Sequence, residues 1–269
     1  MNLRRAAASD PALFPYLLEL AWADSGGDGK AVRAAVDPQT TELRLELMQF
    51  LIEHGDANEA MSVFLALGEV NAAARGNIVA ALLKAKQFVL ARDIRLGERT
   101  GTKNENAIDN GDFEQRVGDD DSGFGWHLGR EREAVRLSLD DDQPYSGANS
   151  LHVVYKGNSN PTSHTISQLI VVAPNTRYRL SFMARSKELV TAGLPVVTIA
   201  DANSDAAYVL AQSESITGNT SEWKKYVVEL ATTNKTGAVI ISLQRRVCAV
   251  SQCPIFGDIW LDNFALQKL

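Results

Sequence analysis

The sequence predicts a chain that combines two structural classes, a short all-α segment followed by an antiparallel β-sandwich. Two patterns lead to this prediction. From Pro11 to about Arg95 apolar residues recur at every third or fourth position, which is the period of amphipathic helices. Beyond residue 108 apolar and polar residues alternate, which is the period of half-buried strands. At 269 residues the chain is also long enough for two cores of ordinary size.

The all-α segment is expected to span residues 1–100. In LRLELMQFLIEHG, the apolar residues Leu43, Leu47 and Leu51 share one side of a helix. The pattern breaks at Gly55 and then resumes, so we expect two antiparallel helices joined by a tight turn.

Two stretches of this segment resemble tetratricopeptide repeats. GDANEA places the small Ala60 where the second helix of that family packs against the first, and KQFVLA places Ala91 in the equivalent position. The resemblance covers about residues 38–97 and implies helical repeats of the kind that bind protein segments. A plain helical bundle is the alternative, because two units are fewer than the roughly three that such repeats need for independent stability.

The stretch ERTGTKNENA is polar and aperiodic, and we expect a linker at residues 101–107. Residues 108–269 then contain nine or ten short strand-like runs separated by Gly, Pro, Asn and Asp. In TRYRLSFMAR, for example, Tyr178 and Phe182 would face the core and Arg179 the solvent. Because no helical pattern intervenes, consecutive strands should be antiparallel and fold as two packed sheets.

The order of landmarks in residues 108–269 resembles a known family. The landmarks are NGDFE, GW, YSGANSLHV, SQLIVVAPNTRYRLSFMAR, WKKYVVEL and GDIWLDNFALQ. In that order and spacing they resemble the jelly-roll carbohydrate-binding modules of the galactose-binding-like superfamily, especially the families grouped as 4, 9 and 22. The resemblance implies a jelly roll that binds a polysaccharide or oligosaccharide. It does not fix the ligand, because the superfamily also contains modules that bind protein.

A sugar-binding face needs aromatic rings for the apolar sides of sugars and polar groups for the hydroxyls. Strand alternation supplies the candidate ligand-binding residues Arg185, Tyr208, Gln244, Arg246 and Trp260. We expect Arg185, Gln244 and Arg246 to form a strip together with Tyr208 or Trp260. The same strip would also suit a protein interface, where Arg and aromatic residues are enriched.

The other two tryptophans of this region, Trp126 and Trp223, are interpreted as anchors in the core or at the edge of the sandwich.

Members of the resembling families often hold a structural calcium ion between the first and last strands. Carried over to this sequence, the resemblance implies Glu114 of NGDFE and Asp262 of WLDNF as metal ligands, with backbone carbonyls supplying further oxygens. The aspartate runs GDDDSG and LDDDQ do not match a twelve-residue calcium loop with its closing Glu, and are interpreted as turns.

Cys248 and Cys253 lie between two strand-like runs, where a disulfide would staple a hairpin loop. Such a bond would imply an oxidising compartment. A pair of reduced thiols is the alternative, whereas structural zinc is disfavoured because no histidine lies near these cysteines in the sequence.

Composition excludes several kinds of partner. The net charge of −6 and the absence of a basic stripe argue against nucleic acid. No apolar run approaches the roughly 18 residues that a transmembrane helix needs. The first residues do not have the pattern of a signal peptide, so export would require a signal or another region upstream of this sequence.

The sequence does not predict an enzyme. It contains none of the G-x-S-x-G, H-E-x-x-H and G-x-x-x-x-G-K-[ST] motifs, and its histidines lack metal or triad spacing. We therefore expect an extracytoplasmic binding protein of bacterial type, with a glycan on the sandwich and a possible protein partner on the helices. The alternative is a scaffold protein of the cell envelope or of exopolysaccharide machinery that binds no sugar.

Overall fold

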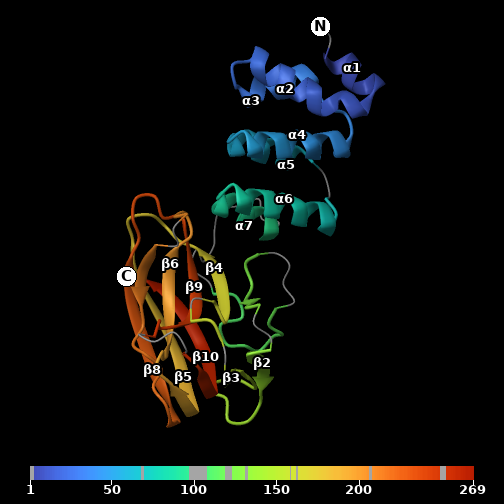
Figure 1. The fold of residues 1–269 in the computed structure, drawn as a ribbon. Coiled ribbons are helices and arrows are strands. Elements are labelled where there is room, and N and C mark those ends of the chain that lie inside the picture. Colours follow the sequence, from blue (N-terminus) through green and yellow to red (C-terminus); the bar gives the residue numbers. More distant parts are fainter. Residues whose placement is uncertain are drawn as a thin grey trace. The chain divides into compact units, whose positions relative to one another are not determined.

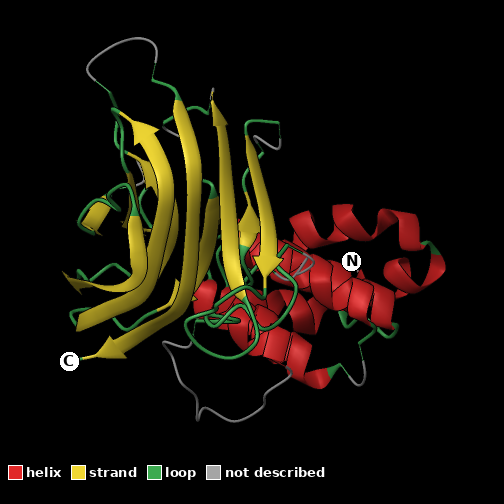
Figure 2. Ribbon diagram, turned by 90° about the horizontal axis from the view of Figure 1, so that it is seen from below, coloured by secondary structure: helices red, strands yellow, loops and turns green. Residues whose placement is uncertain are grey.

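The computed structural model describes residues 3–67, 70–96, 108–118, 123–130, 133–157, 159–161, 163–205, 208–248 and 253–269. The chain divides into two compact units, Met1–Gly101 and Thr102–Leu269. Helices make up the first unit and strands the second (Figure 1, Figure 2). The linker predicted at residues 101–107 lies outside the described residues. None of the described helices is both long and apolar enough to cross a bilayer.

The helical unit contains three antiparallel helix pairs, preceded by α1 (Leu3–Ser9) and a short 3₁₀ turn, η1 (Pro11–Leu13). The pairs are α2 (Phe14–Asp24) with α3 (Gly29–Val36), α4 (Thr41–Glu53) with α5 (Ala57–Ala66), and α6 (Ala72–Lys84) with α7 (Phe88–Leu96). Figure 1 shows the pairs stacked in layers, and α4 contacts both α2 and α6.

The sequence pattern predicted two of these pairs, and the structure adds α2–α3 before them. Three stacked pairs reach the number at which helical repeats become stable on their own. The alanines singled out in the sequence, Ala60 and Ala91, are fully buried. Membership of the tetratricopeptide family stays a prediction.

Polar caps explain where these helices begin. The side chains of Asp28, Thr40, Asp56 and Asn71 accept hydrogen bonds from first-turn amides of α3, α4, α5 and α6. Each cap satisfies an amide that has no partner inside its helix, which contributes about 1 kcal/mol.

The second unit is a sandwich of two five-stranded sheets. One sheet, here called the Trp260 sheet, has the order β2 (Val135–Asp140), β3 (Ser150–Gly157), β10 (Ile255–Lys268), β5 (Arg177–Thr191), β8 (Thr220–Ala231). The other, here called the Gln244 sheet, has the order β1 (His127–Leu128), β4 (Ile166–Val171), β9 (Ala238–Arg245), β6 (Pro195–Asp201), β7 (Val209–Gln212). Neighbouring strands in the described residues are all antiparallel.

The chain crosses repeatedly from one sheet to the other. From β3 onward the order β3-β10-β5-β8 in one sheet faces β4-β9-β6-β7 in the other, which is the eight-strand arrangement of a jelly roll. The predicted fold class, a helical segment followed by an antiparallel β-sandwich, is confirmed.

The core lies between the two sheets and contains the side chains that alternation assigned to it. Val153, Tyr178, Phe182 and Ile241 are all fully buried there. Trp126 is also buried, as expected.

The NGDFE segment forms a turn beside this core. Phe113 packs against Trp126, with 5.4 Å between ring centres, and Trp126 packs against Phe264 at 5.2 Å. The amide of Phe264 donates to the carbonyl of Gly111. A Cβ atom at residue 111 would lie 2.4 Å from the Phe264 carbonyl oxygen, so this close approach requires glycine.

Candidate functional site

Four side chains form a row across the outer face of the Trp260 sheet: His152 on β3, Trp260 on β10, Arg185 on β5 and Trp223 on β8. Strand register brings them together, because Trp260 lies opposite His152 on one side and opposite Arg185 on the other. Strands β5 and β8 are also neighbours, and the Arg185 guanidinium carbon is 5.2 Å from the Trp223 ring centre. We call these four residues the Trp260 row.

Both faces of the Trp260 ring are covered. The His152 ring stacks on it, with 4.4 Å between ring centres and 4° between planes. The guanidinium carbon of Arg185 lies 4.5 Å from the Trp260 ring centre. Because β3 and β5 flank β10 on opposite sides, these contacts occupy opposite faces of the indole. Trp260 is therefore a fixed member of the row, and only its edge is open to solvent.

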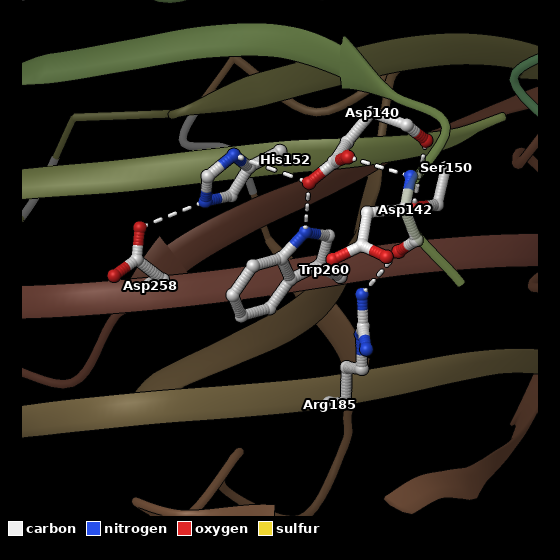
Figure 3. A network of polar contacts seen from close by, with 7 residues as sticks. All are labelled: Asp140, Asp142, Ser150, His152, Arg185, Asp258 and Trp260. Carbon is white, nitrogen blue, oxygen red and sulfur yellow. Dashed lines mark hydrogen bonds and ion pairs between the residues drawn. The ribbon is translucent and has the colours of Figure 1, made fainter. Parts of the chain in front are cut away.

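Polar contacts hold three members of the row, His152, Trp260 and Arg185 (Figure 3). The Trp260 indole N–H donates to Oδ2 of Asp140 at 2.6 Å. His152 Nε2 is 2.7 Å from Asp258 Oδ1, and its Nδ1 is 3.6 Å from Asp140 Oδ2. Arg185 Nη2 donates to the carbonyl of Asp142 at 2.7 Å.

The Asp140 carboxylate is stabilised in its charged form. Burial acts to raise its pKa. This effect is outweighed by hydrogen bonds from the Trp260 indole and the Asp142 amide and by the positive charges of His152 and Arg185, so the pKa is lowered overall. Asp140 therefore stays an acceptor for Trp260 at neutral pH.

The Trp223 end of the row is its open end. The Trp223 indole N–H donates to the carbonyl of Gln143 at 3.1 Å. Tyr145, which follows in the β2–β3 loop, approaches Trp223 with 6.0 Å between ring centres and 65° between planes. Trp223 is partly exposed and Tyr145 is 45% exposed. These two rings are the accessible aromatic surface beside Arg185.

The sequence of this domain also matches a known protein family. Residues 105–246, more than half of the chain, match the family model described as "Carbohydrate binding domain" (CBM_4_9). The chain belongs to this family. The resemblance to carbohydrate-binding modules is thereby confirmed for the second unit. No curated protein matches the chain.

Several solved structures are similar to the carbohydrate-binding domain. One, titled "CBM4 structure and function", is 14% identical with a TM-score of 0.45, covering 61% of this chain and all of its own. A CBM22-1 xylan-binding domain from Paenibacillus barcinonensis Xyn10C is 15% identical with a TM-score of 0.41, covering 58% of this chain and 90% of its own. TmCBM61 in complex with β-1,4-galactotriose is 18% identical with a TM-score of 0.42, covering 61% of this chain and 99% of its own.

The single strip predicted from the sequence does not exist in the carbohydrate-binding domain. Arg185 and Trp260 do lie together in the Trp260 row, but Gln244 and Arg246 lie in and just after β9 of the Gln244 sheet. Tyr208 directly precedes β7 of that same sheet. The prediction failed because alternation tells which side of a strand a residue faces and not which sheet the strand enters.

The predicted ligand-binding residues on or beside the Gln244 sheet have different neighbours from those of the Trp260 row. Gln244 Nε2 is 2.7 Å from His164 Nδ1, and burial lowers the pKa of this histidine. Arg246 is exposed, and Tyr208 is 62% exposed.

Trp223, interpreted from the sequence as an anchor in the core or at the edge of the sandwich, lies on β8, the edge strand of the Trp260 sheet. Tyr226, Val228 and Leu230 of β8 face the core, so residue 223 has the opposite parity and faces outward. That signal was present in the sequence.

Glu114 and Asp262, the predicted metal ligands, both accept hydrogen bonds from backbone amides of the β2–β3 loop. Glu114 Oε1 accepts two of them, from the amides of Ala148 at 2.8 Å and Asn149 at 2.9 Å. Asp262 is fully buried and accepts from the Ser146 amide at 2.9 Å. A Cβ atom at Gly147 would lie 2.2 Å from Glu114 Oε1, so glycine lets the loop pass over this carboxylate.

The chemistry of this pair fits a hard cation. Burial raises the pKa of Asp262, and the negative charge of Glu114 raises it further. A divalent cation would relieve both effects, and carboxylate oxygens are what calcium takes. Among the described residues no group of three or more Asp, Glu, His or Cys side chains converges on one point, so other ligands would be backbone carbonyls or water.

The two cysteines are joined in the structure as a Cys248–Cys253 disulfide, with 5.9 Å between their Cα atoms. The buried Arg245 at the end of β9 holds one end of this bond, since its Nη2 donates to the Cys253 carbonyl at 2.7 Å. Its Nη1 donates to the carbonyl of Ser159 at 2.7 Å. The disulfide is thereby tied to the Gln244 sheet.

The domain also has a hollow of about 350 Å³ in which residues of β2 lie beside residues around β1 and β4. Its apolar side includes Val117, Leu128 and Leu137, and its polar side includes His164 and Arg245. No Phe, Tyr or Trp of the described chain lines it. The hollow therefore lacks the aromatic surface that the Trp260 row offers.

Proposed function

We propose that this protein binds a glycan through the outer face of the Trp260 sheet. The observation that carries the proposal is the Trp260 row, in which aromatic rings and a guanidinium are aligned across four strands of a carbohydrate-binding domain. Sugar recognition needs this combination, because pyranose rings have apolar sides and polar rims.

The residues of the row and their neighbours Tyr145, Asp140 and Asp258 have different roles in this proposal. Trp223 and Tyr145 supply ring surface for a sugar, since they are the accessible aromatics beside Arg185. Arg185 and Asp258 supply polar groups for hydroxyls. Trp260 and Asp140 position Arg185 and His152, because the Trp260 ring is fixed between them and its indole is bonded to Asp140. A face whose side chains are already ordered binds with a smaller entropic cost.

We propose binding without catalysis. Within the described residues, both ring nitrogens of His152 face carboxylates, Nε2 that of Asp258 and Nδ1 that of Asp140. The groups that face its two ring nitrogens are thus carboxylates and not the hydroxyl or thiol of a nucleophile. The network therefore orders the sheet face and does not assemble a catalytic triad.

A structural calcium ion is part of the proposal, with Glu114 and Asp262 as its carboxylate ligands. It would stabilise the loop that contains Tyr145. We expect the melting temperature to be a few degrees higher in calcium than in a chelator. Glu114→Gln should remove this difference. A melting temperature indifferent to calcium would count against the ion.

We also propose that the protein works outside the cytoplasm. The support is its Cys248–Cys253 disulfide, because such bonds persist in oxidising compartments.

The test is a glycan array probed with the full chain, wild type and variants. A ring face of about 60 Å² buried against a sugar contributes about 1.5 kcal/mol, which is about tenfold in affinity. We therefore expect selective binding that Trp223→Ala and Tyr145→Ala each weaken by about tenfold. Tyr208→Ala is the matched control, since this exposed tyrosine lies beside the other sheet.

Two results would overturn the proposal. Folded protein that is silent across the array would favour the alternative, a scaffold without sugar binding. Binding that Tyr208→Ala weakens and Trp223→Ala does not would move the glycan to the Gln244 sheet.

A further inference from the structure

The helical unit has a groove of about 500 Å³ between α2 and α4. We call it the acidic groove, and its lining residues are Pro15, Tyr16, Leu18, Glu19, Glu46, Gln49, Phe50 and Glu53. Nothing in the glycan-binding proposal involves this part of the chain.

The floor of the acidic groove is apolar, and apolar residues extend from it along α2. Leu18 and Phe50 are buried at its base. Leu13 at the end of η1 and Tyr16 and Leu20 on α2 are 46%, 81% and 40% exposed. Large apolar side chains exposed in succession at spacings of three and four residues are typical of a surface that binds a partner.

The walls of the groove are negatively charged. Helices α2 and α4 carry the carboxylates Glu19, Asp24, Glu42, Glu46 and Glu53 and a single Arg or Lys residue, Arg44. Arg44 lines a different hollow, next to Lys30 and Arg33, and its Nε donates to the carbonyl of Pro38. It therefore does not neutralise the groove.

Within the described residues, no Lys or Arg forms an ion pair with the three glutamates of the groove. Glu19 lies 3.8 Å from His54 Nε2, and Glu53 accepts a hydrogen bond from Gln49 at 3.0 Å. Burial raises the pKa of Glu46, because it disfavours the charged form of the carboxyl group. A cation placed in the groove would stabilise that charged form.

We infer that the acidic groove binds a positively charged, partly apolar peptide segment of another protein. Its Lys or Arg side chains would pair with Glu19, Glu46 and Glu53, and its apolar side chains would pack on Tyr16 and Phe50. Charge complementarity sets the sign of the partner, because like charges placed together at an interface are disfavoured. The exposed apolar stripe sets its amphipathic character.

The experiment uses the full chain and an array of peptides about 12 residues long that vary the positions of lysines and leucines. Hits are measured by fluorescence anisotropy, each against a counterpart with glutamate in place of lysine. We expect the lysine peptide to bind and its counterpart not to bind. The double substitution Glu46→Gln/Glu53→Gln and the single substitution Tyr16→Ala should each weaken the hit by about tenfold.

Asp24→Asn/Glu42→Gln is the matched control, because both residues lie on α2 or α4 outside the groove and the double substitution removes the same charge. Equal binding of both peptides, or equal weakening by Asp24→Asn/Glu42→Gln, would overturn the inference in favour of unspecific attraction. Absence of any lysine-dependent hit would overturn it as well.

A second copy of the chain is the competing occupant, because the hollow lined by Lys30, Arg33 and Arg44 has the opposite charge. Self-association in sedimentation that Glu46→Gln/Glu53→Gln abolishes would assign the groove to that copy and contradict our inference. Glycan binding is unaffected by either outcome, so the two proposals fail separately.

Discussion

The outer faces of the two sheets are built by the same alternation and yet have different chemistry. On the Trp260 sheet two tryptophans, a histidine and an arginine form a row. On the Gln244 sheet the side chains of the central strands that point away from the sandwich core include Val196, Thr198 and Ser242, which are buried, and Leu169, Ile240 and Gln244, which are partly buried. The hydroxyls of Thr198 and Ser242 bond to each other at 2.8 Å. The outer face of the Trp260 sheet therefore has groups suited to binding a ligand, whereas polar side chains of the Gln244 sheet bond to each other.

The largest difference between the two faces should appear on truncating one side chain of each. Trp260→Ala removes a ring covered on both faces and its bond to Asp140. We expect it to lower the free energy of unfolding by about 3 kcal/mol. Gln244→Ala should cost less than about 0.5 kcal/mol. Urea denaturation of the two variants checks this, and similar losses would show that the faces do not differ.

On the Gln244 sheet the largest effect should come from the disulfide beyond β9. Closing so short a loop is worth about 2 kcal/mol in the chain-entropy model. We expect Cys248→Ser/Cys253→Ser to lower the unfolding free energy by about that amount. Glycan affinity should be unchanged, because the Trp260 row is on the other sheet. A parallel loss of affinity would mean that the two sheets are coupled.

A smaller effect should separate the two arginines that the sequence placed in one strip. Arg185 lies between two tryptophan rings, where a guanidinium is held more strongly than an ammonium group. We expect Arg185→Lys to cost about 1 kcal/mol in stability and to weaken glycan binding. Arg246→Lys should change neither quantity. Equal behaviour of the two variants in denaturation and on the array would remove Arg185 from the site.

The smallest predicted effect is a pH dependence of the Trp260 sheet. The pKa of Asp140 is lowered in the folded protein, so its contribution is complete above the ordinary value of about 4 and is lost as the pH falls through the lowered value. Asp140→Asn should therefore be less stable than wild type at neutral pH by less than about 1 kcal/mol. The difference should shrink as the pH falls below the ordinary value of about 4. Denaturation curves that differ by the same amount at every pH would show that the Asp140 charge is not responsible.

Local patterns in the sequence were sufficient for the fold class and most of the core. Tyr178 and Phe182 face inward and Arg185 outward, as alternation required, because side-chain direction depends only on the strand itself. The outward direction of Trp223 was equally readable, because Tyr226, Val228 and Leu230 of the same strand have the opposite parity and face the core. Glu114 and Asp262, by contrast, were implied by the family resemblance, and they accept hydrogen bonds from the loop at residues 146–149.

Long-range arrangement could not be obtained in this way. Gln244 and Trp260 are separated by a single loop in the chain but lie in different sheets, because the jelly roll sends β9 and β10 to opposite layers. The acidic groove was missed for a related reason. Tyr16 and Phe50 belong to different helix pairs, and only their packing creates the groove.

The four tryptophans of the chain allow the most direct test of the central claim, because each marks a different place. Trp22 is in the helical unit, Trp126 is in the core, and Trp223 and Trp260 are in the row. The measurement is a titration of ¹⁵N-labelled full chain with the strongest hit of the glycan array, followed by the indole N–H signals. Our account predicts shifts for Trp223 and Trp260 and none for Trp22 and Trp126. Saturable glycan binding that leaves the Trp223 and Trp260 signals in place would contradict it.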